Sequence, residues 1–255
     1  MFQKIILQCR YRGEQRANYN WGSIFHGLLL QALPPKTAAA LHQSQLRPFS
    51  QYVLPHPDQQ LLWKIGLWDA ETADQITRVL LPLTKLELKQ KGTTLEVTEI
   101  QRAILSEADF FSQFFTEEKP CRRYEIEFLT PCNHKQDGEY SLFPSPKLIV
   151  NSLNKRYGAF VKDISLDDPE AMEQIAAHLR IVRYNLRSAV YYLENTKITG
   201  YLGKITLVIT GPEQLARVAG ALLSFAEYSG LGIKTALGMG GVSVKRIPSL
   251  ETEKA

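Results

Sequence analysis

The sequence has few cysteines: Cys9, Cys121 and Cys132 among 255 residues. Their odd number and wide spacing argue against a disulfide scaffold, and the absence of a CxxC pair argues against a structural zinc site. The N-terminus lacks the long apolar region of a secretory signal, and no stretch approaches the roughly 20 apolar residues that span a bilayer. These absences predict a soluble, cytoplasmic protein without a membrane segment.

A strong excess of charge of one sign is also missing. The formal net charge is +4, charged residues make up 22% of the chain and hydrophobic residues 44%. Such a composition is typical of a globular protein with one large core or two small ones. A mild positive excess permits nucleic-acid binding without arguing for it, so local clusters of basic residues must decide.

Hydrophobic periodicity predicts the same order of elements in both halves of the chain, namely strand, helix, strand, strand, helix, strand. In the first half we expect strands at 4–12, 48–55, 60–68 and 85–101, and helices at 23–33 and 70–83 with a short helical turn at 37–42. In the second half we expect strands at 123–130, 182–194, 200–210 and within 236–246, helices at 169–179 and 212–228, and a hairpin in the Pro-rich insertion after residue 130.

A doubled order of this kind is the plan of two tandem ferredoxin-like (RRM-like) domains, an α+β fold. The boundary should fall between residues 106 and 122. We therefore predict an N-terminal domain at 1–115 and a C-terminal domain at 116–255.

Glycine is concentrated near the C-terminus, in residues 230–242 (GLGIKTALGMGGV), hereafter the glycine segment. Lys234 and Thr235 lie among its five glycines, which are Gly230, Gly232, Gly238, Gly240 and Gly241. Glycines permit positive φ and close approach of another chain, and exposed N–H groups in such a loop can bind phosphate oxygens, with Lys234 adding charge. The segment follows a helical pattern instead of opening one, so it is neither a P-loop nor a dinucleotide fingerprint. A helix-capping glycine before a tight turn also explains one or two of these glycines.

The glycine segment, preceded by LLSFAEYSG, resembles the C-terminal signature of the RAMP superfamily of CRISPR proteins. More narrowly, it resembles the repeat-processing endoribonucleases found beside type III interference systems. The other segments that resemble this family are SIFHGLLLQAL at 23–33 with LH at 41–42, RPFSQYVL at 47–54, FLTP at 128–131, FPSP at 143–146 and GYLGKIT at 200–206. The resemblance therefore touches nearly the whole chain.

This resemblance implies tandem ferredoxin-like domains and metal-independent cleavage within CRISPR repeat RNA of a precursor transcript, with no cofactor. The ribose 2′-hydroxyl attacks the adjacent phosphate and leaves a 2′,3′-cyclic phosphate and a 5′-hydroxyl. Such chemistry needs a base, an acid and positive charge at the phosphate. A transient association with a type III interference complex and a monomeric or homodimeric state are the expected assemblies.

His42 is the first candidate catalytic residue, because it lies after the short helical turn, where the family places its catalytic histidine. His26, in the first helix, is the second candidate and also matches relatives. A role as an exposed or capping residue stays open for His42, as does a packing role for His26. If both act, one is the base and the other the acid, and the sequence does not assign these roles.

The sequence departs from the common family pattern, which adds a tyrosine in the first helix and a lysine after the histidine. Leu30 stands near the tyrosine position, and no lysine lies between His42 and Phe49. Arg47 is the candidate for the charge on the phosphate, and Tyr52 is a weaker candidate participant. We expect no catalytic role for the other histidines, His56, His134 and His178, and no metal site, because no His, Asp and Glu set has metal-ligand spacing.

Two further clusters combine basic and aromatic residues, which suits phosphate charge and base stacking. Lys155 and Arg156 precede Tyr157, and Arg183 and Arg187 share one face of a predicted strand around Tyr184. An ordinary solvated face explains either cluster equally well.

Two alternatives to a nuclease remain at this point. A non-catalytic RAMP subunit that binds guide RNA in an interference complex would need the glycine segment but not the histidines. A metabolic enzyme on a ferredoxin-like scaffold is the remote alternative, because a fold alone does not fix a function.

Overall fold

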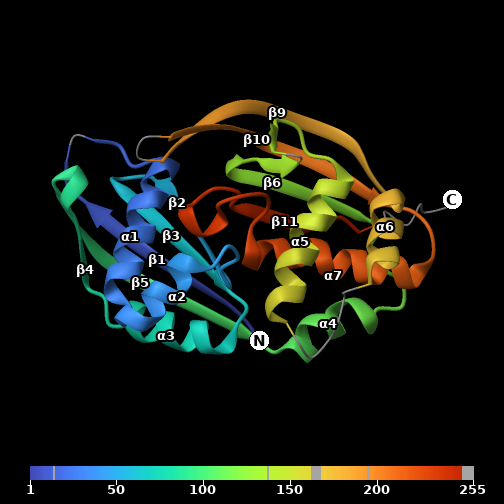
Figure 1. Ribbon diagram of the computed structural model, residues 1–255, viewed down its shortest axis with the longest axis horizontal. Coiled ribbons are helices and arrows are strands. Elements are labelled where there is room, and N and C mark those ends of the chain that lie inside the picture. Colours follow the sequence, from blue (N-terminus) through green and yellow to red (C-terminus); the bar gives the residue numbers. More distant parts are fainter. Residues whose placement is uncertain (14, 137, 162–167, 194–195, 249–255) are drawn as a thin grey trace, which may run out of the picture.

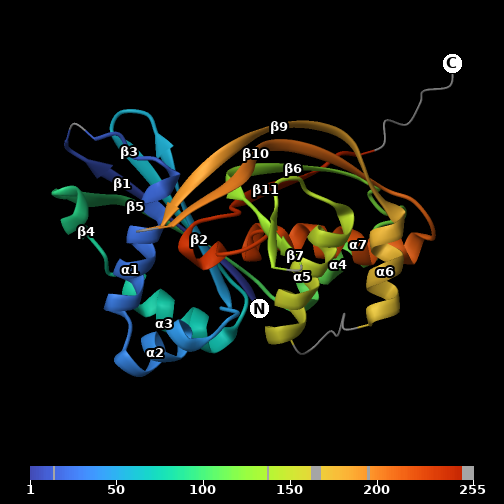
Figure 2. The same ribbon diagram turned by 45° about the horizontal axis from the view of Figure 1, so that its top comes forward.

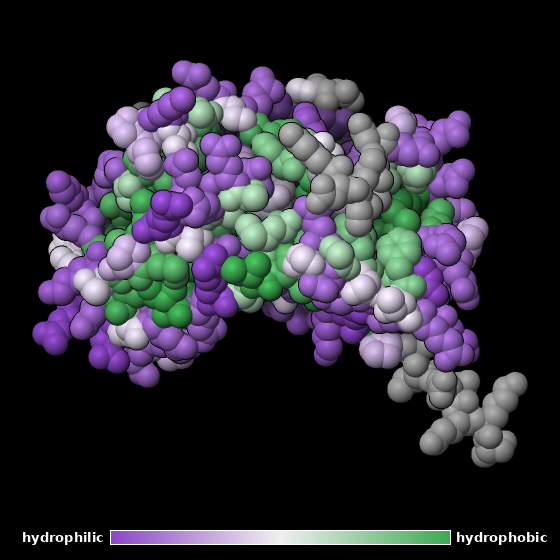
Figure 3. All heavy atoms as spheres, turned by 90° about the horizontal axis from the view of Figure 1, so that it is seen from below, coloured by the Kyte–Doolittle hydropathy of each residue, from purple (hydrophilic) through white to green (hydrophobic). Residues whose placement is uncertain are grey.

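The structure, a computed structural model, describes residues 1–13, 15–136, 138–161, 168–193 and 196–248. Two lobes lie side by side, and each has a twisted antiparallel sheet with helices packed on it (Figure 1). A space-filling view from below shows a notch between the lobes (Figure 3). Among the described helices, none is both long and apolar enough to cross a membrane.

The N-terminal sheet has the strand order β2-β3-β1-β5-β4, and every neighbouring pair is antiparallel. Without the short edge strand β4, this is the four-stranded sheet of a ferredoxin-like domain. Its elements are β1 (Phe2–Tyr11), η1 (Tyr19–Trp21), α1 (Gly22–Ala32), α2 (Pro35–Gln43), β2 (Phe49–His56), β3 (Gln60–Leu67), α3 (Ala70–Leu80), β4 (Lys85–Leu88), η2 (Lys89–Lys91) and β5 (Thr93–Leu105).

The C-terminal sheet has the order β11-β6-β10-β9, again antiparallel throughout. Its elements are α4 (Glu107–Phe115), β6 (Arg123–Cys132), β7 (His134–Gln136), β8 (Glu139–Ser141), α5 (Pro146–Phe160), α6 (Pro169–His178), β9 (Leu179–Leu193), β10 (Thr196–Ile209), α7 (Glu213–Ser229), η3 (Thr235–Leu237) and β11 (Val242–Arg246). The prediction of an α+β fold with two tandem ferredoxin-like domains is confirmed.

Local signals explain where the helices begin. Asp69 precedes α3, and its carboxylate accepts a hydrogen bond from the Thr72 N–H at 2.9 Å, while the apolar face of the helix is buried. Pro34 and Pro35 separate α1 from α2, because proline ends one helix and is tolerated in the first turn of the next.

Two helices, α4 and α5, are not among the predicted elements. Ser145 caps α5, with its Oγ accepting from the Leu148 N–H at 3.3 Å, and Pro146 occupies the first turn. The prolines of this insertion indicate a break in regular structure, yet one of them opens a helix, where its missing N–H costs nothing. The predicted hairpin in the same insertion is confirmed as the β7–β8 pair.

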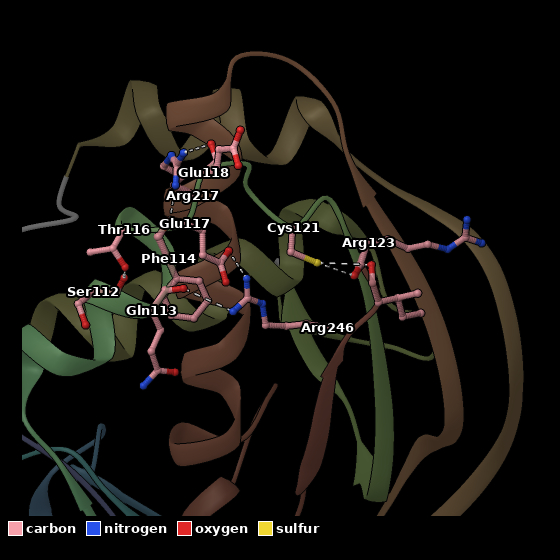
Figure 4. Close-up of polar contacts among 11 residues, drawn as sticks. Ser112, Gln113, Phe114, Thr116, Glu117, Glu118, Cys121, Arg123, Arg217 and Arg246 are labelled. Atoms are coloured by element: carbon pink, nitrogen blue, oxygen red, sulfur yellow. Dashed lines mark hydrogen bonds and ion pairs between the residues drawn. The ribbon is translucent and has the colours of Figure 1, made fainter. Parts of the chain in front are cut away.

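Packing places the boundary between the domains ahead of α4, which corrects the predicted division at 115/116. The three buried phenylalanines of α4 (Phe110, Phe111 and Phe114) belong to the C-terminal core, not to the N-terminal one. The chain after α4 is held to α7 by Arg217, which donates to the carbonyls of Phe114 at 2.8 Å and Glu118 at 3.2 Å (Figure 4). Arg246 of β11 pairs with Glu117 in the same region.

The end of α7 fastens the two domains together. The Tyr228 carbonyl accepts a hydrogen bond from Ser50 Oγ of β2 at 2.6 Å. On β3, a Cβ added to Gly66 would lie 2.0 Å from the same carbonyl oxygen, so this approach requires glycine. The glycine segment continues from α7 and lies between the two lobes (Figures 1 and 2).

Candidate active site

His26 lies on the buried side of α1, next to the glycine segment. Its ring stacks on Phe49 of β2 with centroids 6.0 Å apart, and 6% of the residue is exposed. The pKa of His26 falls to about 4, chiefly because the ring is buried and also because Arg47 and His42 bring positive charge near it; a hydrogen bond with the Ala236 backbone acts in the opposite direction. The ring is therefore neutral at pH 7.

His42 lies in the last turn of α2 and its side chain is exposed. Arg47, just before β2, holds this helix end: its Nε donates to the Leu41 carbonyl at 2.6 Å and an Nη to the His42 carbonyl at 3.4 Å. Burial lowers the pKa of Arg47, although a guanidinium keeps its charge at neutral pH. The fold thus brings His26, His42 and Arg47 together, as their electrostatic coupling indicates.

The glycine segment forms the wall of this site opposite α1. Gln51 of β2 donates from Nε2 to the carbonyls of Gly22 at 2.8 Å and Ala236 at 3.0 Å, so it ties α1 to the glycine segment. The indole of Trp63 in turn donates to the Gln51 amide oxygen at 2.9 Å, which fixes the amide orientation. This buried network positions the Ala236 carbonyl beside His26.

The five glycine N–H groups do not face solvent, which corrects their predicted role as phosphate donors. Each one donates within the protein, and all five glycines are buried. The acceptors of Gly230, Gly232, Gly238, Gly240 and Gly241 are, in that order, the Ala226 carbonyl, Ser152 Oγ, the Thr235 carbonyl, the Pro131 carbonyl and Thr130 Oγ1. Four of them have positive φ, and an added Cβ at any of them would meet neighbouring atoms. These glycines serve close packing and chain reversal.

Lys234 is the exposed residue of the glycine segment, in left-handed backbone with φ 54°. Thr235 beside it is 5% exposed and opens η3, where the first backbone donors have no partner inside the helix. The predicted charged contact at Lys234 therefore remains available, whereas Thr235 is buried.

Tyr52 lies on the other face of the N-terminal sheet from His26, which corrects its place in the candidate site. Neighbouring residues of a strand point to opposite faces, and Gln51 faces α1. Tyr52 packs its ring on Gly241 and lines a separate 150 Å³ cavity with Lys64 and Glu227. Burial and the nearby Glu227 charge raise the pKa of the Tyr52 hydroxyl well above its ordinary value.

A groove of 590 Å³ begins beside the α2–β2 loop and runs along α5 to the glycine segment. We call it the lysine groove, because four exposed lysines line it: Lys135, Lys147, Lys155 and Lys234. No Asp or Glu lines it among the described residues. Sequence reasoning found Lys155 and Lys234 but missed Lys135 and Lys147, since the β7–β8 hairpin and α5 bring them there from separate segments.

Arg156 is a structural residue, which corrects the prediction that it contacts RNA. It is 8% exposed, and its guanidinium donates to the Gly232 carbonyl, to the Ser152 carbonyl at 3.0 Å and to Ser152 Oγ at 2.6 Å. Burial lowers its pKa to about 10, so it stays charged at pH 7. Arg156 thus fastens the glycine segment to α5.

Arg183 and Arg187 are exposed on β9, the edge strand of the C-terminal sheet. Their cross-strand partners are Thr206 and Leu202 of β10. Neither arginine lines the lysine groove.

The other three histidines are not part of the His26, His42 and Arg47 cluster, although His134 lines the lysine groove. His134 is buried against Tyr201, with its Nδ1 3.0 Å from the hydroxyl, and burial lowers its pKa to about 4. His178 contacts Thr210 through Nδ1 at 3.1 Å, and His56 ends β2. Within the described part of the chain, no three His, Cys, Asp or Glu side chains gather as potential metal ligands.

Comparison with known proteins places these features in a family. A profile described as CRISPR-associated endoribonuclease Cas6 matches residues 126–242. The CRISPR-associated endoribonuclease Cas6 of Mycobacterium tuberculosis (strain ATCC 25618 / H37Rv) is 31% identical over 234 residues, 90% of this chain and 73% of the relative. That of Streptococcus thermophilus is 31% identical over 222 residues, 87% of this chain and 90% of the relative.

Solved structures agree in fold. A Cas6 product complex superposes with a TM-score of 0.77 at 22% identity and covers 96% of this chain and 100% of that chain. The Thermus thermophilus Cas6 superposes with a TM-score of 0.70 at 21% identity and covers 96% of this chain and 98% of that chain. At these identities, the likeness concerns the arrangement of the two ferredoxin-like domains.

Proposed function

The chain belongs to the CRISPR-associated endoribonuclease Cas6 family and is an endoribonuclease that processes CRISPR precursor RNA; from this we propose that it cuts repeat RNA without a metal, by attack of a ribose 2′-hydroxyl on the adjacent phosphate. The products would be a 2′,3′-cyclic phosphate and a 5′-hydroxyl. The observation that carries the proposal is the cluster of His26, His42 and Arg47. The loop between His42 and Arg47 lines the start of the lysine groove with Gln45 and Leu46.

Arg47 supplies the charge that stabilises the phosphorane. Two of its donors hold the end of α2, and the remaining guanidinium N–H groups would bind the phosphate. The same residue also holds the backbone carbonyl of His42. Arg47→Lys keeps a charge but loses the planar fork, so we expect a large loss of cleavage rate and a smaller loss of RNA affinity.

The environments of the two histidines favour different roles. Burial lowers the pKa of His26 to about 4 in the free protein, so the ring is unprotonated at pH 7, as a base must be. We therefore assign it as the base for the 2′-hydroxyl. A phosphate bound between His26 and Arg47 would offset the arginine charge and raise the basicity of the ring. His42, whose side chain is exposed, then protonates the leaving 5′ oxygen.

The lysine groove holds the RNA backbone on the approach to the histidines. Its charged lining is entirely positive among the described residues, which suits a polyanion. Lys155 and Lys234 were expected from the sequence, and Lys135 and Lys147 join them. Arg183 and Arg187 on β9 remain proposed contacts for RNA that extends beyond the groove.

The first test is incubation of the purified protein with repeat RNA in EDTA. We expect one defined cut whose 5′ fragment carries a cyclic phosphate. Loss of all cleavage on chelation would contradict the metal-free mechanism, and cleavage of RNA with a 2′-deoxynucleotide at the cut site would contradict 2′-hydroxyl attack. Tight binding with no cutting under any condition would instead favour a non-catalytic RNA-binding RAMP subunit.

A second test separates acid from base. RNA with sulfur in place of the leaving 5′ oxygen needs no general acid, because a thiolate leaves readily. This substrate should restore cleavage by His42→Ala to near the wild-type rate and should not restore cleavage by His26→Ala. The reverse pattern would exchange the two roles.

Association with a type III interference complex, a monomeric or homodimeric state and a cytoplasmic location stay predictions. Light scattering of the protein alone and with repeat RNA decides the oligomeric state. Co-purification with interference subunits from the native host tests the association.

A further inference from the structure

A second groove, of 1010 Å³, lies on the other side of α1 from the histidines. We call it the α1 groove. One wall is the exposed side of α1, and the other is β4 with η2. Its lining includes Gly27 and Gln31 of α1, Lys85, Lys89 and Lys91 of the opposite wall, and Tyr192 at the end of β9.

Positive charge and amide groups dominate the polar lining of the α1 groove. Among the described residues, three lysines line it against one carboxylate, Glu87, and Lys85 and Lys89 are exposed. Lys91 lies over the Trp21 ring at 5.8 Å, which holds its ammonium at the groove. Amide side chains that can donate to phosphate or to bases complete the lining; they belong to Asn18, Asn20, Gln31 and Gln90.

An exposed aromatic ring stands at one end of the groove. Tyr192 is 49% exposed, and Lys197 lies 5.6 Å from its ring centroid. The Tyr192 backbone N–H donates to Asn20 Oδ1 at 3.0 Å, which fixes this residue of the C-terminal domain to η1 of the N-terminal domain. A basic groove with an exposed ring is the combination that binds single-stranded nucleic acid.

Gly27 supplies an independent observation. It lies inside α1, where glycine is less favourable than alanine by about 1 kcal/mol. Nothing lies within 4 Å of a Cβ built on it, so no neighbour in the protein requires glycine there. By contrast, Gly22 of the same helix touches Gly238. A glycine that opens on a groove and has no packing role keeps that wall free for close approach of a ligand.

The α1 groove and the histidines flank the same helix. Gly27 follows His26 directly, and His26 faces Phe49 and Ala236 on the opposite side. A helix with its side chains is about 10–12 Å wide, so one helix separates the two surfaces. A chain that leaves the active site has little distance to travel to the α1 groove.

We propose that the α1 groove binds a single-stranded RNA segment continuous with the repeat that is cut, with its phosphates on Lys85 and Lys89, its backbone over Gly27 and a base on Tyr192. This inference rests on the proposed function, because the bound segment is a flank of the same substrate. The groove would raise the affinity for RNA that carries this flank and would leave the chemical step unchanged.

The test compares Gly27→Glu with Gly27→Gln, which have the same size and differ in charge, and with Gly27→Ala. Binding is measured for repeat RNA with a single 2′-deoxynucleotide at the cut site, with and without twelve-nucleotide uridine extensions at each end. Gly27→Glu should weaken binding of the extended RNA at least tenfold and binding of the bare repeat less than twofold. Gly27→Gln should give an intermediate loss, and Gly27→Ala should stay within threefold of wild type.

The double variant Lys85→Gln/Lys89→Gln tests whether these two lysines bind RNA phosphates. Each lost phosphate contact lowers the slope of log K against log salt by about 0.7 for a single strand, so the slope for extended RNA should fall by roughly 1.4. Lys119→Gln/Lys245→Gln, which removes two exposed lysines outside the groove, should leave the slope unchanged.

The outcomes separate this inference from the proposed function. If wild type does not cut repeat RNA, the proposed function fails. If wild type cuts, while Gly27→Glu and the lysine pair bind extended RNA as wild type does, the α1 groove does not bind RNA. Equal losses for bare and extended RNA would also overturn the inference. Circular dichroism and the cleavage rate at saturating bare repeat show that the variants are folded.

Discussion

Gly22 at the start of α1 and Gly238 in the glycine segment lie with their backbones in contact: a Cβ built on Gly238 would lie 2.9 Å from the Gly22 Cα. The Tyr191 hydroxyl closes the same contact and donates to the Leu237 carbonyl at 2.6 Å. Three distant segments thus meet at the N-terminus of the helix that carries His26. The glycine segment serves the active site here as a backbone surface that α1 can approach.

Alanine at Gly22 and alanine at Gly27, both in α1, should change stability in opposite directions, because only Gly22 is in close contact with other atoms. Gly22 has helical backbone, so alanine is favoured locally, but its Cβ would lie 2.7 Å from the Tyr191 hydroxyl and 3.0 Å from the Gly238 Cα. We expect Gly22→Ala to destabilise the protein by about 1–3 kcal/mol through overpacking, and Gly27→Ala to stabilise it by up to about 1 kcal/mol. Urea unfolding of both variants measures the change in stability. Equal changes at the two positions would contradict the close contact of Gly22 with Gly238 and Tyr191.

Lys155 and Arg156 are neighbours in sequence that should respond to substitution in opposite ways. Arg156→Ala removes a buried guanidinium and leaves the Gly232 carbonyl without its donor, so the protein should lose about 1–3 kcal/mol of stability. Lys155→Ala removes an exposed charge from the lysine groove, so stability should change by less than about 0.5 kcal/mol. Its RNA affinity should fall and the salt slope should decrease by roughly 0.7.

The unfolding measurement and the RNA titration are made on both of these variants. An Arg156→Ala protein as stable as wild type, or a Lys155→Ala protein with unaltered RNA binding, would contradict the assignment of one residue to structure and the other to RNA.

Stability should fall on acidification because two histidines are buried in the neutral form. The pKa of His26 and of His134 is about 4 in the folded protein, below the ordinary value of 6.5. A histidine with a lowered folded pKa binds fewer protons when folded than when unfolded between these values. Its contribution is therefore present above pH 6.5 and is lost as the pH falls towards 4, by roughly 3 kcal/mol at most for each residue.

Urea unfolding at pH 7.5, 6, 5 and 4.5 measures this loss. His26→Asn and His134→Asn should each flatten the curve, with His56→Asn as the exposed control. A stability that rises on acidification in wild type would contradict the buried, neutral state of these rings.

Substitution of Tyr52 and of His42 should affect cleavage differently, because Tyr52 lies on the face of the N-terminal sheet away from His26. Tyr52→Phe removes a hydroxyl on the face away from His26, so single-turnover cleavage should stay within about twofold of wild type. His42→Ala removes the proposed acid, and loss of a proton-transfer group costs roughly 10²–10⁴-fold in rate. Rapid-quench measurements with labelled repeat RNA give both rates. A large loss for Tyr52→Phe with unaltered stability would return Tyr52 to the active site.

Several features of the fold could be read from the sequence because they depend on local patterns. Alternating apolar residues predict the strands, and the doubled order of elements predicts two ferredoxin-like domains. Helix α5 could not be read in this way, because the prolines before it indicate a break, and only a capping Ser145 distinguishes a helix start from a loop. Helix α4 was missed, and its phenylalanines show their role only against the C-terminal core.

The features of the candidate site likewise fall into those that the sequence predicts and those that depend on the tertiary structure. The sequence by itself determined the family signature and the position of His42 at the end of a short helix, and it predicted Arg47 as the residue that brings positive charge. Only the tertiary structure decided that Tyr52 faces away, that Arg156 is buried beside an exposed Lys155, and that Lys135 and Lys147 join the groove. These facts depend on which face of a strand or helix is covered by a segment far away in the chain, and local sequence carries no record of that distant partner.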